Sequence, residues 1–171
     1  MERQIILSNS VMRLFWEVTN KKDYLERALS LIHDWCECEC AGIRIVDKTT
    51  NTIPYLATRG FTEEFVKQES RLSLDHDQCA CTRIIMNVPE TQDYAAVTEG
   101  GSFYLTQSAA FVGQLDPSQL SRFRGVCVKS GFQTIIIIPI RHQQTVLGAI
   151  HITDRREVAL SSREVETLES V

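Results

Sequence analysis

The chain has 171 residues, of which 43% are hydrophobic and 23% charged, the composition of one globular domain with a buried core. Its net charge of −4 and its scattered lysines and arginines argue against a nucleic-acid-binding surface. No apolar run reaches the length of a membrane span and no signal-peptide pattern opens the chain, so the expected location is the cytoplasm. The six cysteines therefore indicate free thiols, a metal site or redox chemistry before a disulfide framework.

Two helices are predicted at the start of the chain. Apolar residues recur at helical spacing from Gln4 to Val18. A polar break at 20–23 follows, in which Asp23 is suited to a helix N-terminus, and a second apolar stripe runs from Leu25 to Trp35. We expect two consecutive amphipathic helices.

Three cysteines lie in the hexapeptide WCECEC, residues 35–40. Strand alternation would place Cys36, Cys38 and Cys40 on one face, where alternate residues are about 7 Å apart. At that spacing the three thiols need help from neighbouring strands or a local bend to hold one ion. We therefore interpret Cys36 and Cys40 as small buried side chains at the beginning of the first strand.

A hairpin is predicted next. AGIRIVD has Ile43 and Ile45 on one strand face and Arg44 and Val46 on the other, and IPYLATRG is typical of the returning strand. An unpaired guanidinium inside a sheet is costly. Arg44 should therefore either pair with an acidic residue, for which Glu99 is a candidate, or meet an anionic ligand in a pocket.

The middle of the chain is predicted to contain short helices and one edge strand. Thr62 is suited to cap a short helix, and CACTRIIMN, from Cys79 to Asn87, is typical of another. The stretch SFYLT, residues 102–106, is expected to form an edge strand. Irregular backbone should connect these elements.

The last third of the chain predicts a helix, a second hairpin and a final helix. Asp116-Pro117 should begin a helix that carries Cys127 on its apolar face and ends near Gly131. TIIIIPI is too apolar to alternate and predicts a central strand buried on both faces. VLGAIHITD is its expected partner, with Gly148 at a close backbone approach. The order of elements describes an α+β domain, with an antiparallel sheet covered on one side by the terminal helices.

The closing segment TIIIIPIRHQQTVLGAIHITD resembles the last hairpin of a GAF domain, in which an apolar strand ending in Pro precedes a polar turn and a second apolar strand. CAGIRIVD with IPYLATRGF, TEGGSFYL, and RFRGVCVKSGFQTIIIIPIR also resemble one cysteine-containing subset of GAF domains. That subset occurs in bacterial and archaeal sensor histidine kinases and related regulators. The resemblance covers the chain from about Asp23 onward.

This resemblance implies a GAF-like antiparallel sheet of about six strands, with terminal helices on one face and a loop-covered ligand pocket on the other. Residues 1–22 would form an N-terminal signalling and dimerisation helix, and residues 23–171 the sensory domain with a truncated last helix. The expected partners are a second copy of the chain, bound through the terminal helices, a small-molecule ligand and an output signalling domain outside this chain.

Four cysteine positions carry the chemical hypothesis. The subset typically has cysteines at positions matching Cys38, Cys79, Cys81 and Cys127. With His76, the motif H-x-x-C-x-C could contribute to a zinc or iron-sulfur site, although its spacing is not that of the common C-x-x-C knuckle. Without a metal, two thiols near a helix N-terminus that face a third thiol would make a disulfide-forming redox sensor.

Aromatic residues and histidines add little further signal. Tyr55 and Phe103 are candidates, with Arg44 and Glu99, to line the ligand pocket, although aromatic residues on strands are more often core. His151 has little claim as a site residue because it lies on a strand face. Haem is a further cofactor that relatives imply, but the C-x-x-C-H attachment motif is absent.

The function these observations favour is a non-catalytic sensory GAF domain of a signal-transduction protein. It would sense a small ligand or a redox state through a pocket with cysteine thiols. The alternative is an enzyme of the same fold, a free methionine-sulfoxide reductase in which one cysteine is oxidised and a second resolves it. The cysteine arrangement of this chain does not match that family.

Overall fold

The computed structural model describes residues 2–158 and 160–170. Its described part contains one five-stranded antiparallel sheet, with the strand order β2-β1-β5-β4-β3. The sheet confirms the predicted α+β class, with one strand fewer than the expected number of about six. The strands are β1 (Cys40–Ile45), β2 (Tyr55–Arg59), β3 (Phe103–Leu105), β4 (Thr134–His142) and β5 (Thr145–Asp154).

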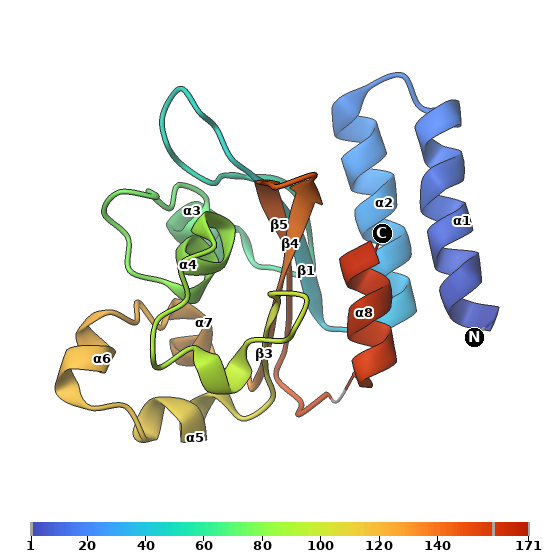
Figure 1. Cartoon of the computed structure of the whole chain (residues 1–171). Helices are drawn as coiled ribbons and strands as arrows, with labels where there is room; N and C mark the ends of the chain where they lie inside the picture. Colours follow the sequence, from blue (N-terminus) through green and yellow to red (C-terminus); the bar gives the residue numbers. More distant parts are fainter. Residues whose placement is uncertain (1, 159, 171) are drawn as a thin grey trace.

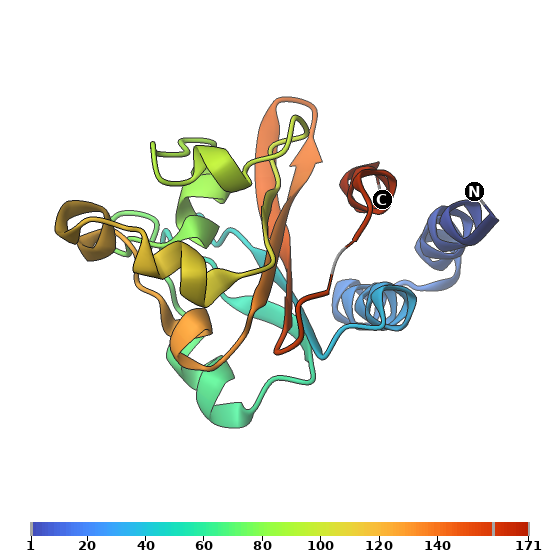
Figure 2. The same ribbon diagram turned by 90° about the horizontal axis from the view of Figure 1, so that it is seen from below.

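Three helices cover one face of the sheet, which we call the helix face (Figures 1 and 2). They are α1 (Glu2–Glu17), α2 (Lys21–Cys36) and α8 (Ser162–Ser170), so the two ends of the chain lie on the same side. Asn20 caps α2 by accepting a hydrogen bond from the Lys22 N–H. Among the described residues, no helix has the length and apolar character that a bilayer span requires.

Short helices and loops cover the opposite face, which we call the loop face (Figure 1). They are α3 (Glu63–Glu69), α4 (Ala80–Met86), the 3-10 turn η1 (Tyr94–Ala96), α5 (Ser108–Gly113), α6 (Pro117–Ser121) and α7 (Val126–Lys129). Along β4, Ile136 and Ile138 pack against the helix-face core, while Ile135 and Ile137 pack against the loop-face core. The predicted two-sided burial of this strand is therefore confirmed.

Two glycines bear on the predictions, one in strand β5 and one between two short helices. A Cβ atom on Gly148 would lie 2.9 Å from the Ile45 Cα, which confirms the close backbone approach predicted there. Gly125 has a φ of +68° and separates α6 from α7, so the single helix predicted from Asp116 to Gly131 is wrong. The Asp116 cap itself is present, since its carboxylate accepts from two backbone N–H groups.

The hexapeptide does not enter the sheet as an alternating strand. Helix α2 continues to Cys36, Glu37 ends it in the left-handed conformation with φ +52°, and β1 begins only at Cys40. As a result Cys36 and Cys38 are buried in the helix-face core, while Cys40 is buried in the loop-face core. The prediction that these three thiols share one face is wrong because α2 extends through Cys36 and the strand begins only at Cys40, so strand alternation does not apply across the hexapeptide.

Candidate functional site

Arg44 lies at the centre of the loop face. Its strand β1 is paired on both sides, and Arg44 stands opposite Tyr55 on β2 and Ala149 on β5. The side chain is fully buried. Its Nη1 donates to the backbone oxygens of Ile53 at 2.8 Å and Glu69 at 2.7 Å, and the Tyr55 ring lies 3.7 Å from the guanidinium carbon. These contacts fix the plane of the guanidinium group.

One edge of this guanidinium has no hydrogen-bond partner. Within the described part of the chain, neither Nε nor Nη2 of Arg44 is bonded, although both atoms are buried. Arg83 shows what this edge ordinarily binds, because its Nε and Nη2 donate to the two carboxylate oxygens of Asp93 at 2.5 and 2.8 Å. Arg44 therefore presents an unfilled version of a carboxylate-binding edge that is filled elsewhere in the same molecule.

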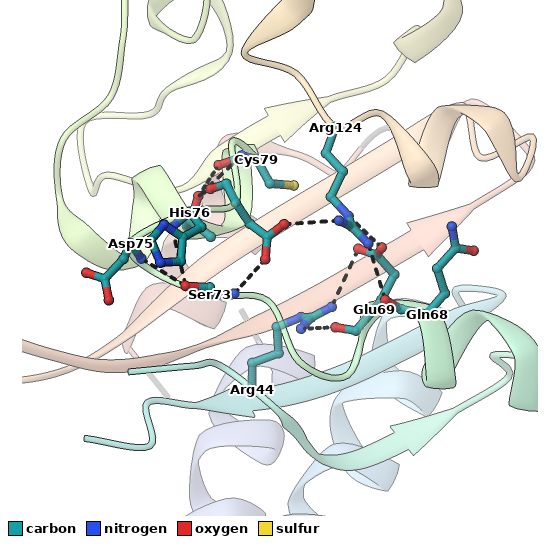
Figure 3. A network of polar contacts seen from close by, with 10 residues as sticks. Arg44, Gln68, Glu69, Ser73, Asp75, His76, Cys79 and Arg124 are labelled. Carbon is teal, nitrogen blue, oxygen red and sulfur yellow. Dashed lines mark hydrogen bonds and ion pairs between the residues drawn. The ribbon is translucent and has the colours of Figure 1, made fainter. Parts of the chain in front are cut away.

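Glu69 is the acidic neighbour of Arg44 (Figure 3). Its Oε2 lies 3.9 Å from Arg44 Nη2, an ion pair too long for a hydrogen bond. The other oxygen, Oε1, accepts from Arg124 Nε at 3.0 Å, and Arg124 Nη1 also donates to Asp77 at 3.0 Å. The predicted partner Glu99 is wrong: it is exposed and lines a surface pocket between the loop before β3 and α8.

Cys79 and Cys81 lie at the start of α4, buried on the loop face. Interaction with Cys81 outweighs burial and lowers the pKa of Cys79 to about 7. The same interaction raises the pKa of Cys81 well above its usual value. Cys79 is thus the more acidic thiol of the pair.

A short polar chain connects Cys127, His151 and Tyr55. The Tyr55 hydroxyl lies 2.7 Å from His151 Nδ1, and the Cys127 sulfur lies 3.7 Å from His151 Nε2. Burial and the positive charge of Arg44 lower the pKa of His151 to about 3, so the ring is neutral. Gly42 stands opposite His151 in the sheet and leaves room for the Tyr55 ring, since a Cβ there would lie 2.6 Å from Tyr55 Cε1.

Comparison with known proteins identifies the fold. No family model matches the chain, and no curated protein is similar to it in sequence. The GAF domain of a phosphoenolpyruvate-protein phosphotransferase from Coxiella burnetii superposes with a TM-score of 0.69, at 12% identity, over 99% of this chain and 88% of that one. The chain has the GAF fold.

Two further GAF-fold neighbours differ in function from each other. A domain assigned to a two-component sensor histidine kinase from Sinorhizobium meliloti has a TM-score of 0.60 at 13% identity, over 90% of this chain and 85% of that one. A type II free methionine-R-sulfoxide reductase from Thermoplasma acidophilum has a TM-score of 0.59 at 14% identity, over 87% and 84%. The TM-scores establish a shared fold, whereas identities of this size leave the activity open.

The GAF fold brings only part of the predicted thiol set together. Cys79, Cys81 and Cys127 are buried in the loop-face core, whereas Cys38 lies in the core on the other side of the sheet. His76 is exposed, and its backbone N–H donates to Ser73 Oγ. Within residues 2–158 and 160–170, no group of three His, Cys, Asp or Glu side chains is arranged to hold a metal ion. The described donors thus do not form the four-ligand set of a structural zinc site or an iron-sulfur cluster.

The sequence did not predict two side chains of this site, His151 and Glu69. The only sequence signal for His151 is a polar residue in the otherwise apolar strand VLGAIHITD. Phe103, a predicted pocket residue, is fully buried on β3 in the loop-face core. We call Arg44, Tyr55, Glu69, Cys79, Cys81, Cys127 and His151 the loop-face cluster.

Proposed function

We propose that the chain is a non-catalytic sensory module of a signal-transduction protein and that the loop-face cluster is its sensing site. The observation that carries this proposal is the unpartnered Nε–Nη2 edge of Arg44, buried inside the fold. Each buried polar group without a partner costs about 1–3 kcal/mol, and more when it is charged. Such a cost at the centre of a core is typical of a binding site rather than of a structural contact.

The edge selects the class of ligand. Its two donors match the two oxygens of a planar carboxylate, as Asp93 shows on Arg83. The Tyr55 ring covers one face of the guanidinium plane, so a ligand would bind at the Nε–Nη2 edge. We therefore propose a small carboxylate as the ligand, with a redox input from Cys79 and Cys127, which are buried in the same loop-face core.

Binding requires movement, because Arg44 is closed off from solvent. The segment from Glu69 to Cys79 contributes both the Glu69 carboxylate and the Cys79 thiol, so its displacement would open the edge. A ligand that binds only the open arrangement shifts the population toward it. We propose that α1, with residues 1–22, and α8 pass this change to an output domain and to a second copy of the chain.

The test is thermal denaturation of the full chain with a panel of mono- and dicarboxylates. We expect a saturable rise in melting temperature for at least one carboxylate, and its loss in Arg44→Lys, which keeps the charge but not the planar edge. Arg122→Lys is the matched control, since the Arg122 side chain is 54% exposed. A panel without effect on the wild type, or an equal effect on Arg44→Lys, refutes the site.

A second candidate is reduction of free methionine sulfoxide, the activity in the name of the Thermoplasma neighbour. The observation that favours it is the Cys79 thiol, with its pKa near 7, beside a second thiol. Free methionine sulfoxide also carries a carboxylate that the Arg44 edge could hold. If the chain reduces this compound with a dithiol reductant and Cys79→Ser does not, the chain is an enzyme and the sensor proposal fails. Binding without turnover supports the sensor.

A further inference from the structure

The pair Cys36 and Cys38 lies outside the loop-face cluster, on the helix face. Glu37 between them is left-handed, with φ +52°, and turns the chain so that both side chains enter the same core. The Cys38 thiol donates to the His33 backbone oxygen at 4.0 Å. Cys36 is the side chain that most affects the pKa of Cys38, and Cys38 the one that most affects the pKa of Cys36. Residues two apart across such a turn lie within the Cα separation of about 4.4–6.8 Å that a disulfide spans.

The two sulfurs lie directly beneath the surface. Cys36 and Cys38 are 6% and 7% exposed, whereas the side chain of the intervening Glu37 is 77% exposed. Arg156 lies close by, since its Nη2 donates to the Glu37 backbone oxygen at 2.9 Å, but its charge is paired with the Asp154 carboxylate. Interaction with Cys36 lowers the pKa of Cys38, against the effect of burial. Cys38 is thus the more nucleophilic sulfur of the pair.

We propose that Cys36 and Cys38 form a reversible disulfide when a hydroperoxide reaches the helix face. The Cys38 thiolate attacks the outer peroxide oxygen, the O–O bond breaks, and the leaving oxygen takes up a proton as an alcohol or water. The Cys36 sulfur then attacks the sulfenic sulfur of Cys38, the S–O bond breaks, and water leaves with the Cys36 proton. Two thiols lose two electrons and two protons, and the hydroperoxide is reduced.

The position of this pair connects it to the first helix. Arg3 on α1 donates to the Trp35 backbone oxygen at 3.0 Å and to the Glu37 carboxylate at 3.2 Å, and Trp35 Nε1 donates back to the Arg3 backbone oxygen at 3.1 Å. A disulfide across Glu37 changes the backbone that these contacts hold. The disulfide itself is independent of the loop-face cluster, while its signalling role rests on the proposed role of α1.

A disulfide that closes so small a ring is readily reduced. Entropic stabilisation by a cross-link grows with the length of the loop it closes, and two residues apart is close to the minimum. Strained disulfides have more oxidising potentials and are the regulatory ones. We therefore expect the pair to cycle between thiol and disulfide rather than to remain oxidised.

Peptide mapping of the intact folded chain tests the proposal. Trypsin separates the thiols into three peptides: residues 28–44 with Cys36, Cys38 and Cys40, residues 72–83 with Cys79 and Cys81, and residues 125–129 with Cys127. After brief hydrogen peroxide treatment and alkylation under denaturing conditions, we expect peptide 28–44 to have lost two hydrogen atoms and to carry one alkyl group. Dithiothreitol before alkylation should restore three alkyl groups.

Three variants assign the bond. Cys40→Ser should keep the disulfide, whereas Cys36→Ser and Cys38→Ser should abolish it. Three alkylated cysteines in peptide 28–44 of the oxidised wild type, or loss of the bond in Cys40→Ser, overturn the proposal. Because the thiols of the loop-face cluster, Cys79, Cys81 and Cys127, lie in the other two peptides, their oxidation bears only on the proposed sensing site.

Amide hydrogen exchange tests the connection to α1. Oxidation should speed exchange in residues 3–17 of the wild type and leave it unchanged in Cys38→Ser. A disulfide that forms without any change in α1 exchange refutes the coupling.

Discussion

The unfilled edge of Arg44 can be tested without knowing its ligand, by replacing the residue with Met. Arg83→Met is the matched control, since both arginines are buried and donate from Nη1 to backbone oxygens. They differ in the Nε–Nη2 edge, which in Arg83 is hydrogen-bonded to Asp93 and in Arg44 makes no hydrogen bond and only a 3.9 Å ion pair with Glu69. The two substitutions should therefore have different effects on the free energy of unfolding.

The magnitudes follow from the contacts. Arg44→Met leaves the backbone oxygens of Ile53 and Glu69 without this donor, which costs about 1–3 kcal/mol each. It also removes two unpartnered donors, which gains a similar amount. The net change should stay below about 2 kcal/mol, because these contributions nearly cancel. Arg83→Met instead leaves the buried Asp93 carboxylate without its cation and should cost about 3–5 kcal/mol.

Urea denaturation followed by circular dichroism measures both changes under one condition. We expect Arg44→Met to unfold close to the wild-type midpoint and Arg83→Met to unfold at a clearly lower urea concentration. Equal losses for the two variants would show that Arg44 is a structural cation like Arg83. In that case the argument that its free edge is kept for a ligand fails.

Three further predictions concern the same face of the sheet. In the unfolded chain His151 binds a proton below about pH 6.5, whereas in the folded chain it does so only near pH 3. The free energy of unfolding should therefore decrease as the pH falls through this window, by up to about 1.4 kcal/mol per pH unit. His151→Gln should weaken the dependence of the urea midpoint on pH, measured at pH 7, 5.5 and 4.5. The same pH dependence in the variant as in the wild type contradicts a neutral buried ring. Cys81→Ala should move the pH midpoint of Cys79 alkylation from about 7 toward the ordinary thiol value of 9.0. Mass spectrometry of peptide 72–83 measures this midpoint, and an unchanged midpoint contradicts the role of Cys81. Gly148→Ala places a Cβ against the Arg44 backbone and should lower the free energy of unfolding, measured by thermal denaturation, by more than about 3 kcal/mol. A variant as stable as the wild type would contradict the close approach.

Periodicity was enough to predict the sheet and its two faces. Ile43 and Ile45 pack on the helix face and Val46 on the loop face, as alternation along AGIRIVD requires. Arg44 was also recognised as a charge that must find a partner or a ligand. These predictions succeed because strand alternation has a fixed period and both faces of this sheet are buried.

The partners of Arg44 could not be predicted in the same way. Glu69 reaches the guanidinium from α3, 25 residues along the chain, and no local pattern reports such a contact. Cys38 was misplaced because a single left-handed residue, Glu37, ends α2 there and shifts the start of β1 to Cys40. Glutamate is not typical of that conformation, so the sequence contained no signal for the turn.

Strand β1 connects the two proposed inputs. It begins at Cys40, two residues after Cys38, and carries Arg44 in its interior. Its pairing with β5 is regular from Cys40 to Ile45, whereas its pairing with β2 is irregular between Ile43 and Arg44. We propose that a change at Cys38 reaches Arg44 along the part of β1 that is paired with β5.

This coupling is measurable because it must be reciprocal. If carboxylate binding at Arg44 and oxidation of Cys36 and Cys38 both move β1, the affinity for the carboxylate should differ between the oxidised and reduced chains. Linkage then requires the ligand to change the thiol–disulfide equilibrium by the same factor. Carboxylate titrations of oxidised and reduced Cys40→Ser would give the change in affinity, and redox titrations with and without the carboxylate would give the change in the thiol–disulfide equilibrium. Cys38→Ser, which lacks the disulfide, is the control. Equal affinities in both states would mean that the two faces of the sheet respond separately.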